Sequence, residues 1–168
     1  MPKAISNTSP LLYLYRIGVL EWLPKLFEEV WTPDAVRFEL EVGRSKGYDV
    51  PDPARISWLK LVNPKTMPSE WLSLDLGTGE IAAMSLALEN PSHVILLDDM
   101  LARRTAKAAG LDVWGTLKVL LEAKSQGFVE RVEPYISRLD TAGMWVSLEI
   151  KQRVLALAGE IESSDNVS

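Results

Sequence analysis

Cysteine is absent from this chain of 168 residues, and histidine occurs only once, as His93. Without cysteine the protein has no disulfide, no thiolate nucleophile and no thiolate metal site. A single histidine also excludes metal sites that need two imidazole ligands. Candidate sites must therefore be built without thiols and without paired imidazoles.

An excess of positive charge is lacking as well. The chain has 18 Lys and Arg residues against 23 Asp and Glu residues, which gives a net charge of −5. Proteins that only coat a nucleic-acid backbone usually carry an excess of Lys and Arg, so this class is disfavoured. An enzyme that binds phosphate through metal ions held by carboxylates is not excluded.

Long hydrophobic runs are also missing. No apolar run approaches the roughly 20 residues needed to span a bilayer. At the N-terminus, Lys3 is followed by only two residues before the polar stretch 6–9, which is not the pattern of a signal peptide. We therefore expect no membrane association and a cytoplasmic location.

The composition is that of an ordinary globular protein, with 47% hydrophobic and 24% charged residues. The length suits one domain with a substantial core. We expect a single domain over residues 1–158, in which 127–158 form a C-terminal helical extension. A flexible tail is expected over 159–168, because few apolar residues follow Glu160.

The stretch 94–127 organises the rest of the chain. Residues 94–97 form an apolar run that is too short for a helix and rich in strand formers, and it ends in the pair Asp98 and Asp99. The stretch then continues with a helix up to Gly110, a strand over 111–114 and a helix over 116–126. This alternation predicts an α/β fold with a parallel sheet, whose chemistry lies at the carboxyl ends of the strands.

The rest of the chain gives a similar pattern. Residues 3–6 predict the first strand, which ends at Asn7. The other expected elements are a helix from an N-cap at Ser9 to Gly18, a helix over 20–28, a short strand at 30–31, a helix over 34–41, an exposed loop over 43–55, a strand over 56–62, a helix capped by Thr78 and ended by Asn90, and amphipathic segments over 133–139 and 146–157.

Four acidic residues are the candidate site. Asp98 and Asp99 follow a strand, Glu80 lies at a helix start and Glu39 in an early helix, while Asn7 ends the first strand. Because the ends of neighbouring parallel strands meet, these side chains can surround one point. Clustered oxygen ligands repel one another unless a cation lies between them, and Mg²⁺ or Mn²⁺ is the natural occupant. Such an ion can activate water and stabilise charge on a phosphate.

Simpler interpretations compete with this one. Glu39 alone is most simply a solvated helix carboxylate, and Glu80 alone could be favoured by the helix dipole. The aspartate pair could merely start the next helix. The simplest roles for three further residues are caps for Ser9 and Thr116 and a surface position for His93.

Four sequence blocks, in order ISNTSPLLYLYRIG, VWTPDAVRFEL, DLGTGEIAAMSLALE and LLDDMLARRTAKAAGLDVWGTLKVLLEAKSQG, together resemble PIN domains. The likeness is greatest to a prokaryotic PIN-like group of nucleic-acid-binding proteins related to the toxins of toxin–antitoxin pairs, and it covers nearly all of residues 3–127. The resemblance implies a compact three-layer α/β/α sandwich with a parallel central sheet. It also implies Mg²⁺- or Mn²⁺-dependent endoribonuclease activity on RNA, an antitoxin protein as partner and a homodimer.

The resemblance also implies roles for single residues. The first aspartate of the family falls on Asn7, with the Ser9 hydroxyl nearby, the second acid on Glu39 and the third on Glu80. The fourth acid falls on Asp98 or Asp99. From their positions, Thr116 is a supporting residue of the site, and Arg103, Arg104 and Lys107 just past the acid pair are candidate contacts for RNA phosphates, although a solvated helix face is the simpler interpretation of these three.

Asn7 departs from the family pattern, because an amide oxygen can bind a metal but brings no charge. The leading hypothesis is a metal-dependent ribonuclease. A second is a non-catalytic PIN-like module that binds RNA or protein through a degenerate site. A third is a receiver-like signalling domain, which is disfavoured because receivers carry their aspartate pair on the first strand, whereas here the pair follows more than half of the chain.

Overall fold

The computed structural model describes residues 1–162 and contains one parallel sheet of five short strands in the order β3-β2-β1-β4-β5. The strands are β1 (Ala4–Ser6), β2 (Val30–Thr32), β3 (Leu59–Leu61), β4 (Val94–Leu96) and β5 (Asp112–Trp114). The central strand β1 pairs with β2 on one side and with β4 on the other, where Ile5 lies opposite Ile95. The predicted parallel α/β sheet is confirmed.

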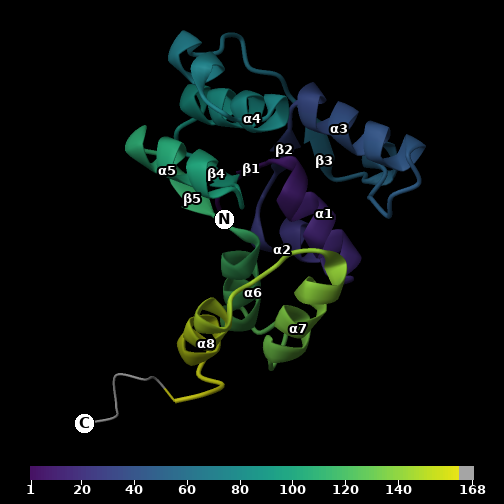
Figure 1. The fold of residues 1–168 in the computed structure, drawn as a ribbon, viewed down its shortest axis with the longest axis vertical. Coiled ribbons are helices and arrows are strands. Elements are labelled where there is room, and N and C mark those ends of the chain that lie inside the picture. The colour runs from purple at the N-terminus through teal and green to yellow at the C-terminus, as the bar shows by residue number, and fades with distance from the viewer. Residues whose placement is uncertain (163–168) are drawn as a thin grey trace.

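Helices cover both faces of this sheet (Figure 1). They are α1 (Thr8–Arg16), α2 (Leu23–Leu26), α3 (Asp34–Ser45), α4 (Thr78–Glu89), α5 (Met100–Ala108), α6 (Thr116–Ser125), α7 (Glu133–Ala142) and α8 (Leu148–Leu157), with 3₁₀ turns η1 (Leu20–Trp22), η2 (Pro53–Arg55) and η3 (Ser69–Ser73). Helices α4 and α5 lie on one side of the strands, and α1, α2 and α6 lie on the other.

The two faces have separate hydrophobic cores because side chains alternate along a strand. Ala4 and Leu96 belong to the core that includes α1, α2 and α6. Ile5 and Ile95 belong to the core beneath α4 and α5. A strand buried on both faces reads as one continuous apolar run, which is why the segment before Asp98 shows no alternation. The expected α/β/α sandwich is confirmed.

Several helix starts differ from the expectation. Helix α1 begins at Thr8 after Asn7, so Ser9 is inside the helix and is not its cap. Thr78 and Thr116 are likewise the first helical residues, each preceded by a glycine. A Cβ at Gly115 would lie 2.6 Å from an Arg103 guanidinium nitrogen, so glycine leaves room for that side chain.

Other boundaries moved for local reasons. Helix α3 continues to Ser45, beyond the predicted end at residue 41. The predicted helix over 20–28 is a 3₁₀ turn followed by the four residues of α2. His93 is buried, 6% exposed, and its ring lies 4.4 Å from that of Trp31, so the expected surface position is wrong.

The C-terminal helices α7 and α8 form where amphipathic segments were predicted, and they share the core of α1 and α6 through Ile136, Leu139 and Val154. No helix within residues 1–162 has the length and apolar character to cross a bilayer.

Glu160 anchors this C-terminal part. Its carboxylate is only 7% exposed and accepts hydrogen bonds from the backbone of Val132 (2.8 Å) and Glu133 (3.1 Å) and from Lys124 Nζ (3.0 Å). Burial alone would raise the pKa of Glu160, but these donors outweigh it and lower the pKa. Glu160, near the start of the expected tail 159–168, is thus held by three donors, and 163–168 lie outside the described residues.

Replacing Glu160 with alanine removes the carboxylate that accepts hydrogen bonds from Lys124, Val132 and Glu133. We expect Glu160→Ala to lower the free energy of unfolding by about 1–3 kcal/mol, since the donor of buried Val132 loses its partner. Urea unfolding at pH 7 measures the effect, with the exposed Glu162→Ala as control and an expected change within about 0.5 kcal/mol. Equal stability of the two variants would contradict the anchoring role.

Candidate functional site

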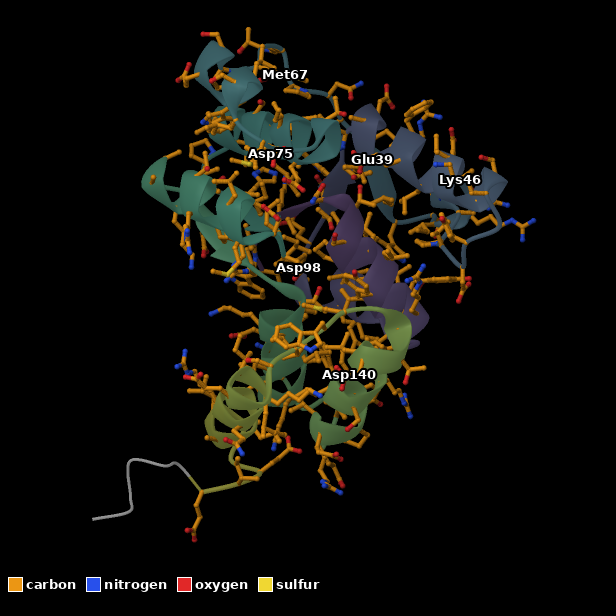
Figure 2. All side chains as sticks on the ribbon, in the orientation of Figure 1. Glu39, Lys46, Met67, Asp75, Asp98 and Asp140 are labelled. Atoms are coloured by element: carbon orange, nitrogen blue, oxygen red, sulfur yellow. The ribbon has the colours of Figure 1, made fainter. Side chains whose placement is uncertain are left out.

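The carboxyl ends of β1 and β4 and the starts of α1, α4 and α5 meet at one rim of the sheet. Asn7 follows β1, and Asp98 and Asp99 lie between β4 and α5. Glu80 is in the first turn of α4, and Glu39 reaches this turn from α3 (Figure 2). The fold thus brings these residues, distant in sequence, to the same end of the sheet.

Glu39 ties three helices together. Its carboxylate accepts a hydrogen bond from the Thr8 hydroxyl and another, of 2.9 Å, from the backbone nitrogen of Gly79. A Cβ at Gly79 would lie 2.7 Å and 2.8 Å from the two carboxylate oxygens, so only glycine permits this approach. Both oxygens of Glu39 are therefore engaged with the starts of α1 and α4.

Glu80 lies among other carboxylates. Burial raises its pKa, and the negative charges of Asp99, Glu39 and Asp75 raise it further, while the backbone of Gly77 acts in the opposite direction. The shift shows that several negative charges lie near one another at this rim. These charges disfavour the ionised form of Glu80.

Asp98 is held by α6. Its two oxygens accept hydrogen bonds from the Thr116 backbone nitrogen (2.8 Å) and the Thr116 hydroxyl (2.7 Å). Burial raises the pKa of Asp98, and the bonds from Thr116 and the charge of Arg103 oppose that rise. Arg103 also donates to the carbonyl of Leu97 (2.9 Å). Asp98 is therefore engaged in joining the end of β4 to α6.

Asp99 is differently placed although it is the next residue. It is exposed and caps α5, with Oδ2 accepting from the Ala102 backbone nitrogen (2.9 Å). Its other oxygen, Oδ1, accepts no hydrogen bond from residues 1–162. Asp99 therefore does start the next helix, as the simpler interpretation expects. Asp98 does not, because its carboxylate binds Thr116 of α6.

Asn7 contributes an acceptor without a partner. The residue is 3% exposed, and its side-chain oxygen Oδ1 has no hydrogen-bond partner within the described chain. A buried amide oxygen left unpaired is costly, so such an atom calls for a ligand or water. Its position directly after β1 is the one where the sequence predicted a metal ligand.

The donor chemistry fits a hard divalent ion, because carboxylate and amide oxygens are the available groups. However, residues 1–162 contain no group of three or more Asp, Glu, His or Cys side chains arranged to hold one ion. The expected convergence of all four acids on one point is therefore not found. What the structure does show is the effect of the Asp99 charge on Glu80 and, separately, the unpartnered Oδ1 of Asn7 at the end of β1.

Sequence reasoning missed two residues of this rim. The hydroxyl that contacts an acid is that of Thr8, whereas Ser9 was expected there. Thr8 is the first helical residue after Asn7, one position earlier than the hydroxyl expected from the sequence. Asp75, in the segment before α4, adds to the charge around Glu80 and was passed over because it lies in a loop.

The three basic residues of α5 are not equivalent. Arg103 is turned inward to Leu97 and Asp98. Arg104 and Lys107 are exposed and form no ion pair with any described residue. A role for these residues in binding phosphate stays a prediction.

The Asp98–Thr116 contact predicts a pH-dependent loss of stability in Thr116→Val. The variant leaves Asp98 Oδ2 without a donor, and we expect a loss of about 1–3 kcal/mol at pH 7. The Thr116 hydroxyl stabilises the ionised form of Asp98. Because burial raises the folded-state pKa of Asp98, its carboxyl becomes protonated in the folded state before the pH reaches the ordinary aspartate pKa of about 3.9, and the loss of stability should therefore shrink as pH falls toward that value. Urea unfolding across this range measures it, and a loss independent of pH would contradict the assignment. Thr105→Val, which removes an exposed hydroxyl bonded within its own helix, is the control.

The crowding of charge predicts that Glu80→Gln stabilises the protein at neutral pH. Because the folded-state pKa of Glu80 is raised, its ionisation costs stability above that pKa, and the cost is absent below the unfolded pKa of about 4.3. The melting temperature of the variant should therefore exceed that of the wild type at pH 7, and the two should converge near pH 4. Glu70→Gln, on an exposed turn, should change neither value. A destabilised Glu80→Gln at pH 7 would show that the carboxylates do not repel one another.

Comparison with known families identifies the fold of the chain. A family model described as a PIN domain matches residues 3–160, which is nearly the entire chain and includes α7 and α8. None of the curated proteins is similar enough to match. The five-stranded parallel sheet and its helices on both faces agree with the family match, and the chain belongs to the PIN domain family.

Proposed function

We propose that this protein is a metal-dependent endoribonuclease that hydrolyses RNA phosphodiesters with Mg²⁺ or Mn²⁺. One observation carries the proposal. In a PIN domain, Asp99 lies close enough to Glu80 for its charge to raise the pKa of Glu80, at the same end of the sheet as the unpartnered oxygen of Asn7.

Asn7, Glu80 and Asp99 would hold the ion. A bound divalent ion supplies Lewis-acid stabilisation of the charge that develops on the phosphate. Glu39 acts through position, since its contacts with Thr8 and Gly79 fix the turn that carries Glu80. Asp98 acts in the same way, because its bonds to Thr116 fix the chain immediately before Asp99. Of the adjacent pair, we therefore assign ion binding to Asp99 and positioning to Asp98.

A broader role is proposed from the resemblance to toxin-related PIN proteins. In this proposal the protein is the toxin of a toxin–antitoxin pair, acts in the cytoplasm, forms a homodimer and is inhibited by an antitoxin protein. Exposed Arg104 and Lys107 on α5 are the proposed contacts for RNA phosphates flanking the cleaved bond, because they have no partner among the described residues.

The alternative is a PIN-like module that binds RNA or a protein without cleaving it. Two observations favour it. Asn7 supplies no charge where the family pattern has an aspartate, and the described residues contain no three-carboxylate group. In this alternative the rim retains the fold of the site, and the net negative charge of the ligand set is too low to hold an ion firmly.

A cleavage assay on single-stranded RNA separates the two functions. We expect the wild type to cleave RNA in Mg²⁺ or Mn²⁺ and to be inactive in EDTA. Asp99→Asn should reduce the rate on the order of 100-fold, the size of effect found when one charge-stabilising group is lost. The control Asp112→Asn changes an exposed aspartate at the start of β5 and should leave the rate unchanged.

Equal cleavage by wild type and Asp99→Asn would refute the ribonuclease assignment. An inert wild type that gains metal-dependent cleavage on Asn7→Asp would instead establish the degenerate module. Under our proposal Asn7→Asp changes an already active enzyme and at most strengthens its affinity for the ion.

A further inference from the structure

A cavity lined by α3 and the start of α4 shares one residue, Glu39, with the candidate site. It has a volume of about 540 Å³ and is lined mainly by apolar surface. Ala35, Phe38 and Val42 follow one another at helical spacing along α3, and Thr78 closes the cavity from the start of α4. Glu39 also lines it, and Glu39 is the residue that binds the backbone of Gly79 beside Glu80.

Phe38 is the unusual member of this cavity. Its side chain is 64% exposed, although it lies on a helix whose residues Val36 and Leu40 are fully buried. A large aromatic ring left in solvent forgoes the burial that stabilises such side chains elsewhere, and it offers a flat face to a ligand.

We propose that Phe38 stacks on a base of single-stranded RNA, in a nucleotide next to the bond cleaved at the acidic rim. This inference rests on the proposed function, because it assigns a base-binding subsite to the same substrate. Aromatic side chains bind unpaired bases by stacking and tolerate any sequence, since every base has a π-face.

The charges around the cavity favour a base over a phosphate. Arg37 is the one cation of the lining, and it is already paired with Asp34 (3.4 Å) and with Glu41 (2.9 Å). With Asp34 and Glu39 also in the wall, the lining is negative and repels phosphate. A base is neutral and apolar on its faces, so it fits an aromatic wall surrounded by carboxylates.

The position of the cavity supports the same occupant. Glu39 lines the cavity and also accepts a hydrogen bond from Gly79 beside Glu80, so the cavity adjoins the start of α4, and one RNA strand crossing there would place a base on Phe38 and a phosphate near Glu80. Duplex RNA keeps its bases stacked and paired, so this subsite selects single strands or loops.

RNA binding measured in EDTA tests the subsite without cleavage. The probes are a fluorescent single-stranded RNA and the same RNA with abasic nucleotides. We expect Phe38→Ala to weaken binding of the intact RNA about tenfold, Phe38→Trp to retain it, and the abasic RNA to bind the wild type as weakly as the intact RNA binds Phe38→Ala. Tyr48→Ala, which removes another exposed aromatic ring at 62% exposure, is the matched control.

Equal RNA binding by wild type and Phe38→Ala would overturn the proposal. So would equal binding of the intact and the abasic RNA by the wild type, or no RNA binding by the wild type at all. If Phe38→Ala loses a protein partner but keeps its RNA affinity, the cavity binds protein and the proposal is likewise wrong. Failure of the ribonuclease assignment alone gives a different result: RNA binding depends on the bases and on Phe38, but no cleavage occurs in Mg²⁺ or Mn²⁺. Urea unfolding of each variant checks that exposed Phe38 can be replaced without loss of the fold.

Discussion

Repulsion between carboxylates at the carboxyl edge of the sheet is the constraint on which this site depends. The pKa of Glu80 is raised by burial and by the charges of Asp99, Glu39 and Asp75. A protein gains nothing in stability from such crowding, and the fold maintains it through contacts made elsewhere. Regions that are locally unfavourable and held by their surroundings are typical of sites at which a ligand restores the balance.

The holding contacts divide the acids into two kinds. Glu39 and Asp98 have both oxygens engaged, by Thr8 and Gly79 in one case and by Thr116 in the other. Glu80 and Asp99 carry charge that the protein leaves less compensated. Two glycines make this division sterically achievable, because Gly79 admits the Glu39 carboxylate and Gly115 admits the Arg103 guanidinium beside Asp98. The acids that are fixed by these bonds lie on the same rim as the acids whose charge is less compensated.

The sequence was sufficient to predict the parallel sheet and the residues that lie at the carboxyl ends of its strands. Short apolar runs ending in Asn7 and Asp98 predict strands, and burial on both faces explains their continuous apolar character. The sequence was not sufficient to predict which side chains make the contacts between helices. That Thr8 and not Ser9 meets Glu39, and that Asp98 and Asp99 differ in role, depends on the start of each helix to within one residue. The anchoring of Glu160 was missed because its partners lie 27 to 36 residues away.

The central claim is that Asn7, Glu80 and Asp99 together hold one divalent ion. Titration with Mn²⁺, followed by the electron paramagnetic resonance signal of the free ion, tests this claim without any assumption about the substrate. The account predicts one saturable site per chain that Mg²⁺ competes for and that Glu80→Gln abolishes. Absence of saturable binding, or binding unchanged in Glu80→Gln, would contradict it.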